Sequence, residues 1–322
     1  MIAIILAIVW LVLGVFIALG VWRNLKLMHV CLLMHQGKIP CPDEWRPFLK
    51  INQPDLPNQY LLYLFAFTIG PLRLVLLLCG NLIILLATFF PEDQCRFILH
   101  VGKELILLSA GIKVVHVGQR DREAPCIVAN HGGGFDGHII YNYDRPVTFV
   151  ARAEISKDFF LGRAARRLGV IFVDRETDDS RNKTVDAINS YLRSWTPNQP
   201  SLLVFPEGTT SNHTHVLPFK SGAFRSGMRI QPLRLEYSSK HQLFTCNNDI
   251  LGYVSTLLCI PTMSEVKLHW LPSMTPLPDE SPDAMAERAN RLIAVNGDVF
   301  KMGVGSYRAH RDLQNFLAIN GA

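Results

Sequence analysis

The first 22 residues constrain this chain more than any other feature, because residues 1–22 contain no charged side chain. A helix of this length is about 33 Å long, which is enough to cross the hydrocarbon core of a bilayer. A cleaved signal peptide is the main alternative, but it normally begins with basic residues and has a shorter apolar run. We therefore expect residues 1–22 to form an uncleaved transmembrane anchor helix.

A basic segment and a second apolar stretch follow the anchor. Residues 23–58 contain five lysines and arginines against three acidic residues, so the positive-inside rule predicts a cytosolic linker. Residues 59–94 contain an apolar run with a single charge, that of Arg73. Gly70 and Pro71 should break a helix within this run. The break favours a hydrophobic re-entrant hairpin over a second membrane-spanning segment, and the hairpin keeps the rest of the chain on the cytosolic side.

Composition excludes several classes of protein. Hydrophobic residues make up 49% of the chain and charged residues 18%, which excludes an intrinsically disordered chain. The net charge of +5 suits an anionic membrane surface or a phosphorylated small molecule, and it is too weak to indicate nucleic-acid binding. The seven cysteines are odd in number and include no C-x-x-C pair, so neither a disulfide framework nor a structural zinc site is expected.

Residues 95–322 show the alternation of strands and helices that is typical of an α/β domain. Amphipathic helices are expected between residues 173 and 202 and over residues 283–294. Seven short apolar runs are predicted to be strands: residues 114–117, 126–129, 147–151, 170–173, 202–205, 230–235 and 266–271. The alternation predicts an α/β fold with a mixed, mostly parallel sheet flanked by helices.

The first group of candidate catalytic residues follows the predicted strand at 126–129. Residues 130–136 read Asn-His-Gly-Gly-Gly-Phe-Asp. Because sites in such sheets lie at the carboxyl ends of strands, this position favours function. The glycines allow a tight turn, so the Asp136 carboxylate can orient His131 as a general base. The alternatives are a helix-capping role, or a zinc site that also uses His138.

Two further groups also follow predicted strands. Residues 205–209 read Phe-Pro-Glu-Gly-Thr, and a turn of this kind offers backbone N–H groups to a phosphate. Arg175 follows the run at 170–173, where its guanidinium can hold a phosphate in a bidentate manner. A plain turn and a surface ion pair are the corresponding structural alternatives.

Taken together and in this order, these groups resemble the conserved blocks of the PlsC-type glycerolipid acyltransferase family, over about residues 98–300. The family's first block is N-H-x-x-x-x-D, its second ends in an arginine, its third is F-P-E-G-T, and its fourth is a proline within a strand. The matching positions are Asn130, His131 and Asp136, then Arg175, then residues 205–209, and finally Pro232. Residues 205–212 and 219–224 look like the branch that acylates lysophosphatidylcholine or lysophosphatidylethanolamine. Relatives that acylate lysophosphatidate usually carry arginine where this chain has Thr210, which favours a phosphodiester headgroup.

The resemblance implies the glycerolipid acyltransferase fold and an activity. The expected enzyme is membrane-bound and moves a fatty acyl group from acyl-CoA to the free hydroxyl of a lysophospholipid. His131 would act as general base, Asp136 would hold its tautomer, and amides of the glycine turn would support the oxyanion. The implied substrate-binding residues are Arg175, Glu207, Gly208, Thr209 and Pro232. Acyl-CoA is a co-substrate, and no cofactor or metal is expected.

The expected location is the endoplasmic reticulum membrane, with lipid droplets as an alternative, and the catalytic domain faces the cytosol. Asn182 and Asn212 lie in N-x-T sequons, which stay unmodified on that side of the membrane. Two rival functions differ in class. An α/β-hydrolase esterase shares the His-Gly-Gly-Gly run but needs a G-x-S-x-G elbow, which this sequence lacks. A catalytically inactive membrane scaffold or lipid-droplet protein with the same fold would usually have lost the histidine or aspartate of the first block.

Overall fold

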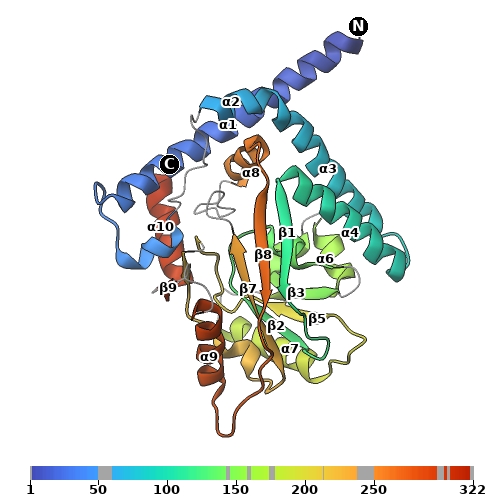
Figure 1. The fold of residues 1–322 in the computed structure, drawn as a ribbon, viewed down its shortest axis with the longest axis vertical. Coiled ribbons are helices and arrows are strands. Elements are labelled where there is room, and N and C mark those ends of the chain that lie inside the picture. The colour runs from blue at the N-terminus through green and yellow to red at the C-terminus, as the bar shows by residue number, and fades with distance from the viewer. Residues whose placement is uncertain are drawn as a thin grey trace.

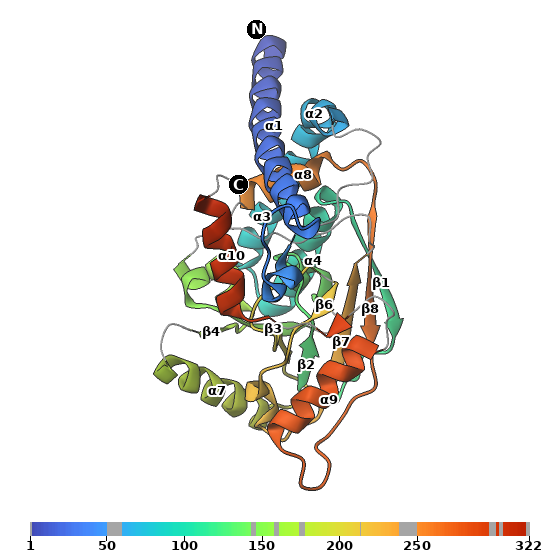
Figure 2. The same ribbon diagram turned by 90° about the vertical axis from the view of Figure 1, so that its left-hand side faces the viewer.

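The computed structural model describes residues 2–49, 60–142, 146–157, 161–173, 178–212, 214–237, 250–295, 301–302 and 305–319. A seven-stranded sheet lies at the centre, and helices cover both of its faces (Figure 1). In both views the N-terminal end of the first helix projects beyond the rest of the molecule (Figures 1 and 2).

The central sheet confirms the predicted fold class and all seven predicted strands. In spatial order the strands are β1 (Ile112–Gly118), β8 (Ser264–Trp270), β7 (Ile230–Tyr237), β2 (Cys126–Ala129), β5 (Ser201–Val204), β3 (Val147–Arg152) and β4 (Ile171–Val173). Every neighbouring pair is parallel except β7 and β8, which are antiparallel. The two predicted amphipathic helices are also present, as α7 (Asp178–Arg193) and α9 (Pro282–Val295).

The two faces of the sheet bury different sets of helices, because successive side chains of a strand point to opposite faces. One face carries Ile127, Leu203 and Leu233, which pack in one core with the N-terminal helices. The other face carries neighbours of these residues in sequence, such as Val128, and packs on α7 and α9. The remaining short elements are α5 (Asp136–Ile140), η2 (Ala153–Lys157), α6 (Leu161–Arg167), η3 (Ser221–Phe224), and the pair β6 (His215–Val216) and β9 (Lys301–Met302).

The first helix is longer than the predicted anchor. Helix α1 (Ile2–His35) does not end at Trp22 but continues into the predicted linker. Its second half is buried against other elements: Asn24 donates a hydrogen bond from Nδ2 to Thr256 Oγ1 over 2.8 Å, and Gly20 lies directly against Ser255. Both partners belong to helix α8 (Ile250–Cys259). Of the basic residues after Trp22, Arg23 and Lys26 are therefore part of this packed helix. The rest of the described linker includes the short helix η1 (Asp43–Phe48).

The second apolar stretch breaks two residues earlier than predicted. Helix α2 (Tyr60–Phe67) ends before Thr68, and helix α3 (Ile69–Ala87) then begins. Pro71 lies in the first turn of α3, where it needs no N–H group. In a continuous helix the ring of Pro71 would clash with the carbonyl of Phe67, four residues earlier, so the break precedes the proline by one turn.

Helix α3 packs closely against helix α4 (Glu92–Ser109), and this helical pair extends beyond the predicted hairpin at residues 59–94 (Figure 1). The re-entrant placement of that hairpin in a membrane stays a prediction. At the crossing, a Cβ added to Gly80 would lie 2.8 Å from the Gly102 carbonyl oxygen, and the reverse distance is also 2.8 Å. Two glycines therefore allow the helix backbones to touch. Helices α1, α2, α3, α4 and α8 share one hydrophobic core with the sheet, so residue 95 is not a structural boundary.

Two helices are long and apolar enough to cross a membrane, at Ala3–His35 and Ile69–Ala87. Only 22% of each apolar window is buried in the isolated chain, and Leu11, Leu78 and Leu82 are exposed. The edge of the sheet at which β7, β2 and β5 end lies toward these helices. Strand β8 starts just after α8, and the last residue of β7, Tyr237, pairs with Val266 near the start of β8. The carboxyl ends of β7, β2 and β5 therefore point toward α8 and the N-terminal helices.

Candidate active site

The site begins at the carboxyl end of β2, where Asn130 fixes the start of the glycine turn. Asn130 is buried, and its Nδ2 donates to the Leu235 carbonyl oxygen over 3.0 Å. Its Oδ1 accepts the Leu235 N–H over 2.8 Å. These two bonds connect the turn to β7 and set the position from which His131 leaves the strand.

His131 and Asp136 form the hydrogen-bonded pair that the sequence predicts. His131 Nδ1 lies 2.7 Å from Asp136 Oδ2. The same carboxylate oxygen accepts the N–H groups of Gly132, at 2.7 Å, and Gly133, at 3.1 Å. The Asp136 side chain is 1% exposed and that of His131 is 24% exposed. The carboxylate is thus buried and oriented, while the imidazole remains accessible.

The glycine amides have a different role from the one expected. Gly132 and Gly133 donate their N–H groups to Asp136, so these two groups do not form the oxyanion hole that the resemblance implied. The turn folds back on itself because Asp136 begins α5 only a few residues later, and its carboxylate satisfies the free amides of the turn. The same amides hold the charge of Asp136 next to His131.

The turn after β5 packs directly against His131. The rings of Phe205 and His131 stack with centroids 4.1 Å apart. Glu207 Oε1 accepts the His131 N–H over 2.8 Å, and Glu207 Oε2 accepts the Leu217 N–H over 3.0 Å. The Ser211 N–H donates to the His131 carbonyl oxygen over 2.9 Å. The backbone of His131 is therefore held on both sides, independently of its ring.

Glu207 is a buried carboxyl in this turn. Its pKa is raised to about 8, mainly by burial and also by the nearby Asp136 charge, while the two backbone N–H donors act in the opposite direction. His138, two residues after Asp136, has a pKa lowered to about 4 by burial and by Lys103, so its ring is neutral. Among the described residues, no cluster of three metal-ligating side chains is found, so His131, Asp136 and His138 do not converge as a zinc site.

Gly208 and Thr209 complete the turn and are each contacted by a residue from elsewhere. Gly208 has φ +71°, and a Cβ at this position would lie 2.6 Å from Lys220 Nζ. Only glycine fits here, because the backbone is left-handed and the lysine side chain lies over it. Thr209 Oγ1 lies 2.8 Å from His310 Nδ1, and His310 belongs to helix α10 (Tyr307–Ile319).

The remaining predicted substrate-binding residues are not placed with this group. Arg175 lies outside the described residues. Pro232 is buried within β7, in register with Val128 of β2, and its carbonyl oxygen accepts the Leu271 N–H over 3.0 Å. Pro232 therefore lies within the sheet rather than at the carboxyl ends of its strands, and its role in substrate binding stays a prediction.

Sequence reasoning missed three residues at the site. The Tyr237 hydroxyl donates a hydrogen bond to Asp136 Oδ1, the oxygen opposite the one that faces His131. Tyr237 ends β7, and the rule that sites lie at the carboxyl ends of strands is the signal that would have identified it. Lys220 and His310 contact the second turn through tertiary structure, and no local pattern marks His310.

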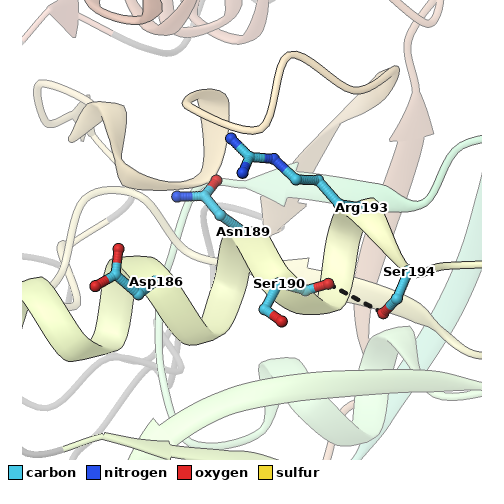
Figure 3. Close-up of a pocket in the computed structure, with 5 residues that line it drawn as sticks. All are labelled: Asp186, Asn189, Ser190, Arg193 and Ser194. Atoms are coloured by element: carbon cyan, nitrogen blue, oxygen red, sulfur yellow. Dashed lines mark hydrogen bonds between the residues drawn. The ribbon is translucent and has the colours of Figure 1, made fainter.

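One pocket of the described chain lies elsewhere, on α7. Five residues of that helix line it: Asp186, Asn189, Ser190, Arg193 and Ser194 (Figure 3). Helix α7 packs through Ile188 and Leu192 near Cys126 and Leu202, close to the starts of β2 and β5. The pocket is therefore at the opposite ends of these strands from His131.

Comparisons with known proteins agree with this geometry. The model of the Acyltransferase family matches residues 112–236. The chain is 33% identical to a lysophosphatidylcholine acyltransferase of Drosophila melanogaster over 165 residues, which is 51% of this chain and 31% of that protein. It is 28% identical to lysophosphatidylcholine acyltransferase 2 of Mus musculus over 276 residues, 77% of this chain and 49% of that protein. It is 29% identical to the lysophospholipid acyltransferase LPEAT1 of Arabidopsis thaliana over 188 residues, 56% of this chain and 46% of that protein.

The chain spans about a third to a half of the length of these curated relatives. The fold is also similar to the crystal structure of PlsC, a 1-acyl-sn-glycerophosphate acyltransferase from Thermotoga maritima. The TM-score is 0.51 at 19% sequence identity, covering 74% of this chain and 94% of that one. This chain has the PlsC-type fold, and its residues 112–236 match the model of the Acyltransferase family.

Proposed function

We propose that this protein is a membrane-bound, acyl-CoA-dependent lysophospholipid acyltransferase in which His131 is the general base. The observation that carries the proposal is the 2.7 Å contact between His131 Nδ1 and the buried Asp136 carboxylate, with the imidazole still partly exposed. The carboxylate favours the tautomer with the proton on Nδ1 and leaves Nε2 as the base. The names of the relatives, lysophosphatidylcholine and lysophospholipid acyltransferases, support the same chemistry.

The proposed reaction needs no covalent enzyme intermediate, because a thioester is already activated. His131 Nε2 takes the proton of the lysophospholipid hydroxyl as its oxygen attacks the thioester carbonyl carbon. The new C–O bond forms, the C–S bond breaks, and the CoA thiolate leaves and takes the proton from His131. Asp136 stabilises the imidazolium that exists between the two proton transfers. General-base assistance of this kind contributes about 10²–10⁴-fold in rate, and the scheme uses no cofactor or metal.

The turn after β5 is proposed to hold the acceptor. Gly208 and Thr209 lie next to His131 because Glu207 and Ser211 bond to its backbone. Lys220 Nζ lies over Gly208 and places a positive charge at this turn, where an acceptor phosphate can bind it. Arg175 and Pro232 retain their proposed substrate-binding roles from the resemblance. With Thr210 in place of arginine, the proposed acceptor is lysophosphatidylcholine or lysophosphatidylethanolamine rather than lysophosphatidate.

The proposed setting is the endoplasmic reticulum membrane, with lipid droplets as a second location and the catalytic domain on the cytosolic side. Helices α1 and α3 supply apolar segments, and the site faces α8, whose Tyr253 ring contacts Phe135 of the glycine turn. A site near these helices can reach two lipid substrates that are concentrated in a bilayer. The assembled pair of His131 and Asp136 argues against the inactive-scaffold alternative.

The test is acyl transfer from labelled acyl-CoA to a panel of acceptors: lysophosphatidylcholine, lysophosphatidylethanolamine, lysophosphatidate and glycerol 3-phosphate. We expect His131→Ala to abolish transfer without unfolding the protein, because the main-chain bonds to Glu207 and Ser211 do not involve the ring. Transfer by purified His131→Ala at the wild-type rate would refute the mechanism.

Glycosylation tests the proposed sidedness. Asn182 is exposed on α7, whereas Asn212 is buried and donates from Nδ2 to the carbonyl oxygens of Arg46 and Leu49, each over 2.9 Å. Asn182 is thus the informative sequon in the folded protein. A glycosidase-sensitive mobility shift that disappears in Asn182→Gln would place the domain in the lumen and contradict the cytosolic assignment.

A further inference from the structure

The Asp136 carboxylate is held from both of its oxygens. Oδ2 faces His131, Gly132 and Gly133, and Oδ1 accepts a hydrogen bond from the Tyr237 hydroxyl. Asp136 is 0% exposed, so its charge is stabilised by these donors rather than by water. The bond from Tyr237 reaches Asp136 from outside the glycine turn and α5.

The sheet positions Tyr237 for this contact. Leu233 of β7 is in register with Ala129, the last residue of β2, so β7 continues past the end of β2. The two bonds between Asn130 and Leu235 hold this extension beside the glycine turn, and pairing with Val266 of β8 holds its other edge. Tyr237 follows two residues after Leu235, and side chains two apart in a strand share a face. Tyr237 therefore lies on the face that also carries Leu233 and Leu235.

The Tyr237 hydroxyl keeps its proton under physiological conditions. Burial and the neighbouring Asp136 charge raise the pKa of Tyr237 well above its ordinary value. The phenol is therefore a hydrogen-bond donor at neutral pH. Its ring is 7% exposed and is part of the hydrophobic core, so the hydroxyl has little freedom to turn away.

We propose that Tyr237 is a positioning residue for the reaction, acting on His131 through Asp136. This inference rests on the proposed function. By bonding Oδ1, Tyr237 fixes the rotation of the carboxylate so that Oδ2 stays in the plane of the imidazole. It also draws charge toward Oδ1, which limits how strongly Oδ2 attracts the Nδ1 proton. Pro232 of the predicted fourth block lies on the same strand, β7, and Tyr237, five residues later on this strand, contacts Asp136.

The experiment combines kinetics with a spectroscopic readout that requires no turnover. In Tyr237→Phe the ring is retained and one donor to Asp136 is removed. We expect kcat to fall about tenfold, the factor that corresponds to losing one hydrogen bond to a charged group, with both KM values within about twofold of the wild type. In ¹⁵N-histidine-labelled protein, the proton between His131 Nδ1 and Asp136 should shift farther downfield, because Oδ2 becomes a stronger acceptor. His131→Asn assigns that signal by removing it.

Tyr191→Phe is the matched control. Its hydroxyl donates to the Pro200 carbonyl oxygen over 2.6 Å on the opposite face of the sheet, and we expect neither kcat nor the proton signal to change. Fluorotyrosine at position 237 retains the hydroxyl as a stronger donor and should move the signal upfield, which tests the inference even if Tyr237→Phe folds poorly.

The outcomes separate this inference from the proposed function. An unchanged proton signal in both position-237 variants overturns the positioning role, whatever the enzyme does. A raised KM with unchanged kcat also overturns it, because that result indicates contact with substrate instead. If the signal moves as expected but the wild type transfers no acyl group to any lysophospholipid, the proposed function fails and the link from Tyr237 to His131 stands.

Discussion

Replacing Asp136 in two ways separates its charge from its hydrogen bonds. In Asp136→Ala, the N–H groups of Gly132 and Gly133 and the Tyr237 hydroxyl lose this acceptor. At about 1–3 kcal/mol for each buried donor, the loss is about 3–9 kcal/mol. That is comparable with the whole stability of a typical domain, about 5–15 kcal/mol. We therefore expect Asp136→Ala to be poorly folded and uninformative about catalysis.

Asp136→Asn should fold and still lose activity. The three donors at Oδ2 require an oxygen there, so the amide oxygen takes that position and the NH₂ group faces the Tyr237 oxygen, which can accept. The tautomer of His131 is then preserved, and only the charge is lost. Two opposite charges centred about 4 Å apart at an effective dielectric constant near 20 attract each other by about 4 kcal/mol, so kcat should fall by about 10²–10³-fold.

The assay is acyl transfer by purified protein, with thermal melts of the same samples. Asp121→Asn is the control, because Asp121 accepts hydrogen bonds from the Glu123 N–H and the Ser273 hydroxyl in a loop next to Gln231, near the start of β7. That variant should lose some stability and keep its kcat. Wild-type turnover by Asp136→Asn, or equal stability of Asp136→Ala and Asp136→Asn, would refute this account of the carboxylate.

Three further substitutions test the turn after β5. Gly208→Ala should lower the stability by about 1–2 kcal/mol, because φ is +71° and the Lys220 side chain lies over this position. Gly134→Ala is the control and should melt like the wild type, because the space around Gly134 is open. Equal melting temperatures of the two variants would contradict the packing described. Folding raises the pKa of Glu207 from 4.5 to about 8, so between these values the folded state binds one more proton than the unfolded state and stability falls as pH rises. Thermal melts of Glu207→Gln at several pH values should show a shallower fall, and an equally steep fall would show that another group is responsible. Thr209→Val removes the bond to His310 and should lower the stability by about 1–3 kcal/mol in thermal melts. In a His310→Ala background the same substitution should lower the stability no further. Additive losses of stability would show that the two side chains are not coupled.

The predicted strands were confirmed because their signal is local. A short apolar run bounded by polar or glycine residues is buried on both faces of a parallel sheet, and β2 and β5 are fully buried along their lengths. Helices were harder to predict from the sequence than strands. Helix α8, which packs on α1, was not among the predicted helices. Helix α10 was not predicted either, although its buried residues Ala309, Leu313 and Leu317 recur every fourth position, as in an amphipathic helix.

The N-terminal region shows how packing overrides a local rule. Charge alone indicated that the anchor helix ends at Trp22. Helix α1 instead packs on α8 beyond this residue and continues to His35. The proline correctly predicted a helix break, but the break lies before Pro71 rather than at it. The reason is that a proline ring clashes with the carbonyl group four residues earlier in the chain.

The sequence by itself determined the order of the seven strands along the chain and the pairing of His131 with Asp136, since five residues and a glycine turn bring those two together. Only the tertiary structure decided what surrounds that pair. Glu207 is 76 residues from His131, and Tyr237 is 101 residues from Asp136. Contacts over such separations depend on which strands are neighbours and in what register. Hydrophobic periodicity does not specify either, because it records which face of an element is buried and not which element buries it.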